Sequence, residues 1–281
     1  MSWVIGALVF WAGASFVNIR IAASPANRSR WATILVPLLF GLAILVLWEG
    51  LVRGLGVNRV ILPPPTEIWA KFITEGPTLW KDFVQTVLKG ALSGFVIGCS
   101  AGFGVAILVD RSQFLQKGLL PIGNFVAALP IIGIAPIMVK WYGFGWESKS
   151  AVVVVMVFFP MLINTVQGLR ETSAMQRDLM VTYAASYWQT MFKLRLPAAM
   201  PFVFNGLKIA STLALIGAIV AEYFGSPIFG MGFRISAAAG RLAMDMVWAE
   251  ILVAAMAGSA LYGTVTLIEK GVTFWHPSQR K

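Results

Sequence analysis

The stretch RETSAMQRDLMVTYAASYWQTMFKLRLPAAMP, residues 170–201, is a polar segment between two long apolar ones. Each apolar segment is long enough to cross a bilayer, which takes about 20 residues. We therefore expect residues 170–201 to meet water at one membrane face. Within them, the run from Ala174 to Leu194 has neither Pro nor Gly, and Ser173 is a suitable N-cap, which predicts a short helix. Because Pro197 suits the first turn of a second helix, a sharp corner is expected just before it.

The composition excludes a soluble globular domain. The 281 residues are 58% apolar and 12% charged, with a mean hydropathy of +0.78, whereas about a quarter of the residues in a soluble domain are charged. The formal net charge of +10 fits basic loops that set membrane topology and meet anionic lipid better than it fits nucleic-acid binding. We predict an all-α polytopic membrane protein, with membrane lipid but no nucleic acid as a partner.

The sequence lacks the residues that most catalytic, metal and nucleotide sites need. Cys99 is its only cysteine and His276 its only histidine, which leaves no material for a disulfide, a Cys/His zinc site or a Ser-His-Asp triad. No GxxxxGK[ST] motif occurs, so any ATP that drives the protein must be bound by another chain. The sequence therefore predicts a non-catalytic subunit with no metal and no cofactor.

Six core transmembrane helices are predicted from the apolar runs. They lie near residues 33–52, 90–109, 119–139, 150–168, 199–222 and 250–268. Residues 3–19 are also apolar, and since no positive charge precedes them we interpret them as an extra membrane helix rather than a cleaved signal peptide. A peripheral segment, or a start codon placed too early, is the alternative. From Thr66 to about Phe83, the helical spacing of apolar residues predicts an amphipathic helix on the membrane surface.

A patch of minimal side chains lies within the polar stretch. Ala184, Ala185 and Ser186 stand between Tyr183 and Tyr187. Small residues let a partner approach the backbone, and aromatic rings supply area to bury, so the patch suits a helix laid into a groove of another protein. At about 25 cal/mol per Å², burying one or two rings would contribute several kcal/mol before ordering costs. A helix lying on lipid headgroups is the alternative.

The run from Asp178 to Pro197 resembles the cytoplasmic EAA loop of ABC-transporter permeases. The acidic position of that motif is Asp178, its glycine position is Ala184, and its final aliphatic-x-Leu-Pro is the run from Leu194 to Pro197. The chain departs from the motif at two places. Leu179-Met180 stands where the motif has an alanine pair, and alanine stands where it has glycine.

Five further motifs, in order along the chain, resemble those of nitrate/sulfonate/taurine permeases and their relatives that serve pyrimidine and flavin precursors. They are at residues 62–69, 128–136, 141–145, 158–160 and 206–210. The likeness runs from about Trp31 to the C-terminus. It implies the transmembrane domain of a type I ABC importer in a bacterial inner membrane. It also implies that this domain works as a homodimer, with ABC ATPase subunits in the cytoplasm and an extracytoplasmic solute-binding protein as partners.

This resemblance implies four parts and a coupling surface. The parts are an N-terminal extension (1–31), a first core helix with the amphipathic periplasmic segment (32–86), a permease core that contains the EAA-type loop at 170–198 (87–270), and a cytoplasmic tail (271–281). A slight excess of Lys and Arg on the side of the loop agrees with a cytoplasmic loop. The residues expected to contact the ATPase are Asp178, Thr182, Ala184, Ala185, Ser186, Leu196 and Pro197.

Polar residues within the predicted spans are candidates for the translocation path. Lys208 lies about 15 Å beyond Pro197 along a helix, near the middle of the bilayer, where an ammonium costs about 2.5–3.5 kcal/mol. It should face either a wet cavity that attracts an anionic solute or an acidic partner on another helix. Glu222, at the other end of that span, could serve an outer gate or lie among headgroups.

Two amides and a proline complete the candidates. Asn124 and Asn164 could line a pathway, although interhelical hydrogen bonding is the commoner use of such amides. Pro130 breaks the predicted span at 119–139 and frees carbonyl groups that protein or a cavity must satisfy. The candidate path is therefore Asn124, Pro130, Asn164, Lys208 and Glu222.

Two other functions are alternatives to a permease subunit. A secondary transporter or channel would need no ATPase, and a membrane enzyme would need a nucleophile, base or metal set that the sequence lacks. For the solute, the family resemblance from Tyr183 to Ser226 favours relatives that import thiamine-pyrimidine or riboflavin precursors. Nitrate, taurine, alkanesulfonates and bicarbonate stay as alternatives, because specificity depends largely on the solute-binding protein.

Overall fold

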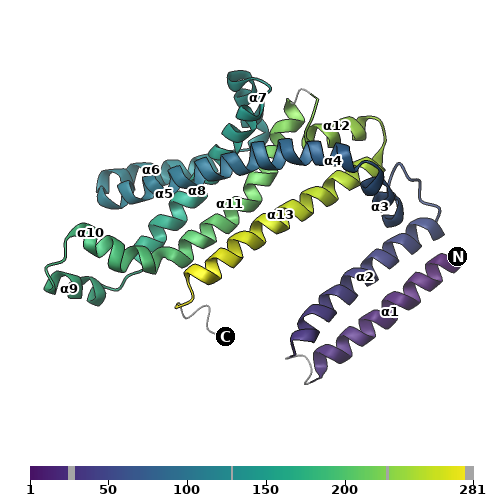
Figure 1. The fold of residues 1–281 in the computed structure, drawn as a ribbon, viewed down its shortest axis with the longest axis horizontal. Helices are drawn as coiled ribbons and strands as arrows, with labels where there is room; N and C mark the ends of the chain where they lie inside the picture. Colours follow the sequence, from purple (N-terminus) through teal and green to yellow (C-terminus); the bar gives the residue numbers. More distant parts are fainter. Residues whose placement is uncertain (25–28, 128, 226–227, 276–281) are drawn as a thin grey trace. The chain divides into compact units, whose positions relative to one another are not determined.

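The computed structural model describes residues 1–24, 29–127, 129–225 and 228–275, and all regular elements in these ranges are helices (Figure 1). Within them, six helical segments are long and apolar enough to cross a membrane. They are α1 (Ser2–Ala23), α2 (Arg30–Gly54), the run Gly76–Arg111, α8 (Trp146–Arg170), the run Tyr187–Phe224 and α13 (Met244–Val272). This confirms the predicted all-α polytopic class, and α1 qualifies by length and composition as the extra helix.

The single span predicted at residues 119–139 is wrong. Two shorter helices, α6 (Gln113–Ala127) and α7 (Ile131–Tyr142), take its place. Pro130 is the N-cap of α7, in an extended conformation that a helix cannot contain. Each of the two helices alone is shorter than the roughly 20 residues that a crossing takes.

The amphipathic helix predicted from Thr66 to Phe83 is also divided. α3 (Pro65–Thr74) ends at Glu75, and α4 (Gly76–Phe83) begins directly after it, because Pro77 lacks the N–H needed to continue α3 but suits a first turn. α4 then continues through a π-helical segment, η2 (Val84–Ala91), into α5 (Leu92–Arg111). The second half of the predicted surface helix is therefore the beginning of a membrane-length helix.

The polar stretch folds differently from the predicted helix and corner. α9 (Ala174–Thr182) ends in a turn at residues 183–186, and α10 (Tyr187–Thr190), the π-helical η3 (Met191–Arg195) and α11 (Leu196–Phe224) follow without a break. The single helix from Ala174 to Leu194 and the corner before Pro197 are thus wrong. The N–H of Leu196 bonds to the carbonyl of Met191, a wider turn through which the helix continues into Pro197 without interruption.

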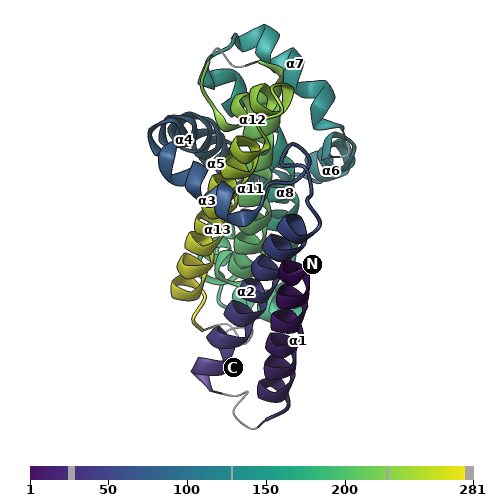
Figure 2. The same ribbon diagram turned by 90° about the vertical axis from the view of Figure 1, so that its right-hand side faces the viewer.

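The chain forms two compact units, which we describe separately. The first comprises residues 1–77 and 237–251, and the second residues 78–236 and 252–281. In the first unit α1 and α2 form an antiparallel hairpin (Figure 2). Ala7 on α1 faces Gly50 on α2, where any side chain would collide, so the two backbones lie very close together. Trp48 and Trp248 meet edge to face in the same unit, with ring centroids 4.9 Å apart.

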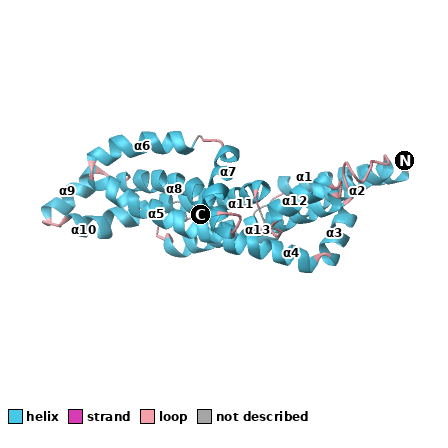
Figure 3. Cartoon of the chain, turned by 90° about the horizontal axis from the view of Figure 1, so that it is seen from above, coloured by secondary structure: helices cyan, strands magenta, loops and turns pink. Residues whose placement is uncertain are grey.

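The second unit is built on α5, α8 and α11 (Figure 3). Gly94, Gly98 and Gly102 form one ridge of α5 against α8, and a Cβ at Gly102 would lie 2.6 Å from the carbonyl oxygen of Phe158. Such small residues let membrane helices pack closely. Beside this ridge, Val153, Val157 and Met161 of α8 join the buried core of the unit with residues of α5 and α11. The three helices form a bundle whose two ends carry the polar groups described below.

Candidate functional site

α9 lies apart from the packed bundle and buries none of its residues (Figure 1). It is held by its own capping box, in which the Ser173 hydroxyl accepts from the Gln176 N–H at 3.2 Å and the Gln176 side chain accepts from the Ser173 N–H at 3.0 Å. The predicted N-cap at Ser173 is therefore confirmed. Apolar side chains on this helix and just after it face outward: Met175, Leu179, Val181 and Tyr183 are all more than half exposed.

The turn after α9 gathers most of the predicted coupling residues. Ala184 has φ of +50°, a left-handed conformation that costs a residue with a side chain about 1–2 kcal/mol. The N–H of Ala185 bonds to the Met180 carbonyl at 3.0 Å, which closes the turn, and Ser186 then caps α10. Asp178 and Thr182 lie exposed on α9 before it. Ala184 thus has the conformation that favours glycine, at the position where the EAA motif carries glycine.

Leu196 and Pro197 do not lie in this exposed turn. They begin α11, and both are half-buried. Of the seven predicted coupling residues, the structure places five on α9 and the turn, and these two at the start of the long helix that leads away from it.

A set of hydrogen bonds ties the polar stretch to the bundle; we call it the anchor cluster (Asp110, Leu169, Tyr187 and Arg195). The guanidinium of Arg195 donates to both oxygens of Asp110, at 2.6 and 2.7 Å, and to the carbonyl of Leu169 at 2.9 and 3.1 Å. The Tyr187 hydroxyl donates to the same carboxylate at 3.0 Å. These bonds join the ends of α5 and α8 to the run that becomes α11. A two-pronged Arg–carboxylate pair fixes direction as well as distance.

The opposite ends of α5, α8 and α11 hold a buried charge cluster (Asp82, Thr86, Lys149, Glu222 and Arg234). Of these, only Arg234 has an appreciably exposed side chain. The carboxylate of Glu222 accepts from the Thr86 hydroxyl at 2.7 Å and from the N–H of Gly232 at 3.0 Å. The Thr86 hydroxyl in turn accepts from the N–H of Met231 at 2.8 Å. Glu222 is thus buried between α11, η2 and the start of α12 (Met231–Gly240).

The rest of this cluster balances its charge. Asp82 accepts from the N–H of Gly230 and from the guanidinium of Arg234, each at 2.7 Å. The ammonium of Lys149 donates to the carbonyl of Phe144 at 2.8 Å and also to that of Gly225. Two cations and two carboxylates therefore lie together at this end of the bundle. Burying opposite charges together costs less free energy than burying one of these charges without a partner.

A family model described as the binding-protein-dependent transport system inner membrane component matches residues 94–274, the range that contains the anchor cluster and the α9 turn. The chain belongs to this family. It is 34% identical to a probable ABC transporter permease protein of Haemophilus influenzae, over 83% of this chain and 94% of the relative. The family predicted from the motifs is thereby confirmed, and with its membrane-length helices this permease is a multi-pass membrane protein.

Two further relatives are named for the solute that they transport. The permease is 29% identical to the formylaminopyrimidine transport permease protein of Halalkalibacterium halodurans, over 87% of this chain and 97% of that protein. It is 28% identical to the riboflavin transport system permease protein of Chloroflexus aurantiacus, over 90% and 94%. These relatives are transport permeases, in agreement with a non-catalytic subunit.

The permease does not gather its predicted path residues at one place. Lys208 forms an ion pair with Glu269 of α13 at 2.5 Å, so it has an acidic partner on another helix. The Asn164 oxygen accepts from the Asn205 amide at 2.9 Å, which links α8 to α11. Pro130 is exposed at the start of α7. Asn124 lies in α6, and its side chain is outside the described part of the structure.

Sequence reasoning missed both clusters apart from Glu222. Asp110 and Arg195 lie 85 positions apart, and Asp82 and Arg234 lie 152 apart. One signal was available: each is a charged residue at or near the end of an apolar run, where opposite charges on neighbouring spans can pair. Such a signal names the candidates but cannot say which acid meets which base.

Proposed function

We propose that the permease forms the translocation path of an ATP-driven importer in a bacterial inner membrane, and that α9 with the turn at residues 183–186 is its docking surface for a cytoplasmic ABC ATPase. The full transporter would be a permease homodimer with two ATPase subunits and an extracytoplasmic solute-binding protein. The observation that carries this proposal is the contrast between α9, which buries none of its residues, and the firm attachment of the following run to the bundle.

The connections of the turn support a role in transmitting motion. From Tyr187 the chain is helical without a break to Phe224, so a displacement of the turn is passed directly to α11. Through Arg195 the same displacement reaches α5 at Asp110 and α8 at Leu169. ATP-driven closure of the ATPase would thus act on three helices together, and each bound ligand would favour the arrangement that it binds better.

For the solute, we propose a thiamine-pyrimidine or riboflavin precursor. The solutes for which the Halalkalibacterium and Chloroflexus relatives are named support this class. The alternative solutes are nitrate, taurine, alkanesulfonates and bicarbonate. The test is uptake of labelled solutes by the complete transporter, with the solute held by its binding protein identified by mass spectrometry; a sulfonate or an inorganic anion in that position would contradict the proposal.

The docking surface is tested by placing a charge on it. Val181 is 74% exposed on α9, and Val181→Asp should prevent co-purification of the ATPase while the permease still inserts into the membrane. Ala185→Trp, which fills the turn, should have the same effect. Leu242→Asp is the control: Leu242 is an exposed leucine in the turn between α12 (Met231–Gly240) and α13, with φ of +60°, which aspartate tolerates.

Two results would contradict the proposal. One is an ATPase complex that survives both Val181→Asp and Ala185→Trp. The other is solute uptake that persists without any ATPase and resists vanadate, which would indicate a secondary transporter or channel instead.

A further inference from the structure

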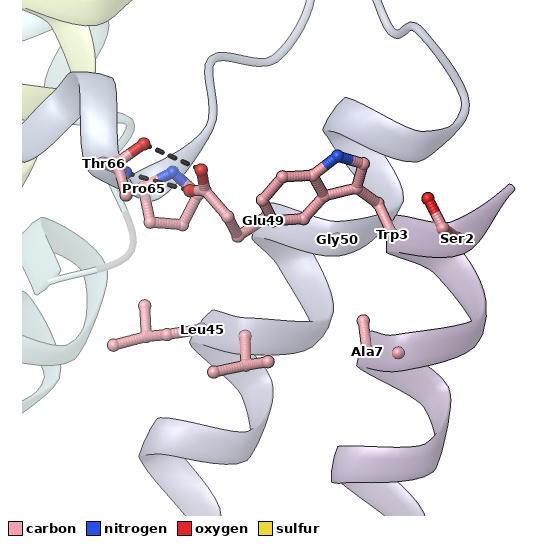
Figure 4. A pocket seen from close by; sticks show the side chains of 10 residues that line it. Ser2, Trp3, Ala7, Leu45, Glu49, Gly50, Pro65 and Thr66 are labelled. Carbon is pink, nitrogen blue, oxygen red and sulfur yellow. Dashed lines mark hydrogen bonds between the residues drawn. The ribbon is translucent and has the colours of Figure 1, made fainter.

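An apolar pocket lies between α1, α2 and the first turn of α3, entirely within the first unit. Its volume is about 580 Å³, within the range of small-molecule sites. Gly6 and Ala7 of α1 line one side, and Leu45 and Val46 of α2 line the other. Figure 4 shows the indole of Trp3 reaching from α1 across Gly50 toward Glu49. The pocket thus has an apolar body and a single carboxylate at its rim.

A second, polar pocket of about 360 Å³ adjoins the first and shares Trp3 with it. This pocket is lined by Arg53 in the last turn of α2, and by Arg59 and Glu67 beyond the end of α2 at Gly54. The guanidinium carbon of Arg53 lies 5.9 Å from the centre of the Trp3 ring, a cation–π arrangement. Trp3 therefore separates an apolar compartment from a charged one.

The rim between the two pockets is firmly built. The Glu49 carboxylate accepts from the Thr66 N–H at 3.0 Å and from its hydroxyl at 2.7 Å, and it pairs with Arg53 one helical turn along α2 (Figure 4). Arg53 donates in turn to the Thr66 hydroxyl at 2.8 Å. These bonds hold the end of α2 against the start of α3. Glu49, Arg53 and Thr66 at this rim are thus each fixed by more than one bond.

The charges around the polar pocket balance. Arg53 and Arg59 face Glu49 and Glu67, and only one nitrogen of Arg59 is close to Glu67, at 3.2 Å. The Arg59 side chain is 77% exposed, so its other N–H groups are free to meet an anion. A rim with paired positive and negative groups fits a headgroup that carries both charges better than one that carries only a negative charge.

The surroundings of the hairpin identify the class of occupant. α1 and α2 each have the length and hydropathy to cross a membrane. In a hairpin that spans the bilayer we expect the apolar pocket to lie among acyl chains and the polar one at the headgroup level. Tryptophan is enriched at that level, with its ring at the boundary of the two media. A molecule that carries an apolar chain next to a phosphate and an amine fits both pockets. Its chain would enter the apolar pocket, and its charged groups would enter the polar one.

We propose that the end of the α1–α2 hairpin binds one zwitterionic glycerophospholipid of the phosphatidylethanolamine type. An acyl chain occupies the pocket beside Gly6 and Leu45, the phosphate meets Arg59, and the amine lies toward Glu67. The lipid would be an individually bound molecule, distinct from the lipids that surround any membrane protein. This site is independent of the proposed transport function, so either can fail without the other.

The test measures lipid retained by the full-length permease, by native mass spectrometry after exchange into detergent with added phosphatidylethanolamine. A Cβ at Gly6 would meet no atom within 4 Å, so Gly6→Leu fills the pocket without a clash. We expect it to weaken lipid binding at least about tenfold, the equivalent of about 1.4 kcal/mol. Gly13→Leu is the matched control, since it lies two turns along the same helix face, lines neither pocket and also has open space. Equal lipid retention by both variants would show surrounding lipid only.

The headgroup assignment is tested by competition. Arg59→Gln and Glu67→Gln should each reduce the preference for phosphatidylethanolamine over phosphatidylglycerol, because each removes one of the two charges that the headgroup meets. Arg241→Gln, an exposed arginine that lines neither pocket, should leave the preference unchanged. If the wild-type permease retains phosphatidylglycerol as well as it retains phosphatidylethanolamine, the zwitterionic assignment is overturned.

Discussion

The two ends of the α5–α8–α11 bundle use the same chemistry in different surroundings. Each end holds an Arg–Asp pair whose carboxylate is hidden: the Asp110 side chain is 4% exposed in the anchor cluster, and that of Asp82 is 0% exposed in the buried charge cluster. Beyond the anchor cluster the chain continues into α9, which buries none of its residues. At the other end, the backbone N–H groups of residues 230–232 are all turned inward onto Asp82, Thr86 and Glu222.

This difference suggests that the two ends of the bundle have different roles, one in transmitting motion and the other in stabilising the fold. A hydrogen-bonded charge pair beside an exposed helix can pass a displacement from that helix into the bundle. The pair at the other end is hydrogen-bonded by its own loop, and we expect it to hold the helix ends together. The following changes test this contrast, beginning with the enclosed end, where a lost charge has no water to replace its partner.

The largest effect is expected from Lys149→Met. The change removes a buried cation that interacts electrostatically with Glu222 and that donates to the carbonyls of Phe144 and Gly225. Leaving a buried charge uncompensated in this way typically costs about 3–5 kcal/mol. The midpoint of thermal unfolding in detergent should therefore fall markedly. Lys140→Met is the matched control, because Lys140 is exposed on α7 and a surface change is worth about 0.5 kcal/mol or less. Equal midpoints for the two variants would contradict a holding role for the cluster.

A smaller effect is expected at the anchor cluster. Arg195→Lys keeps the charge but loses the two-pronged contact with Asp110 and the bonds to the Leu169 carbonyl, at a cost of about 1.5–3 kcal/mol. If the cluster passes motion from α9, solute-stimulated ATP hydrolysis by the complete transporter should fall more than the unfolding midpoint does. Lys193→Arg, an exposed neighbour, is the control. Full coupling in Arg195→Lys would show that the cluster only stabilises the fold.

Much of this architecture is readable from the sequence, because hydropathy and helix capping act locally. The membrane-length helices follow from apolar runs, and Ser173 was recognisable as an N-cap. The turn at residues 183–186 was missed because it contains neither Gly nor Pro and Ala184 adopts a conformation that alanine disfavours. A local signal did exist, since Ser186 and Gln189 form a second capping box that marks the start of α10.

The parts that the sequence could not supply depend on long-range pairing. Lys208 was expected to need either a wet cavity or an acidic partner, and only the fold identifies Glu269 of α13 as that partner. Likewise, Glu222 could be placed near a membrane face by counting residues. Its enclosure by Thr86 and Gly232 depends on how four segments converge, which no local pattern encodes.

The Lys208–Glu269 pair is expected to have an intermediate effect. Lys208→Met should destabilise the permease by about 1–2 kcal/mol, because it leaves a largely buried carboxylate without its partner. Lys208→Met combined with Glu269→Leu should recover most of that loss if the pair only joins α11 to α13. Uptake by the double variant decides the role of Lys208: restored stability with lost uptake would place its ammonium in the translocation path.

The smallest effect concerns the turn itself. Ala184→Gly should raise the free energy of unfolding by about 1 kcal/mol, because glycine adopts a φ of +50° without the steric cost that alanine carries. Ala185→Gly, one residue later and without a positive φ, should bring no gain. If the turn only has to be present for the ATPase to bind, Ala184→Gly should leave ATPase association unchanged. A more stable permease that binds its ATPase less well would instead show that the Ala184 methyl group contacts the partner, and that the strain at this position is retained for that contact.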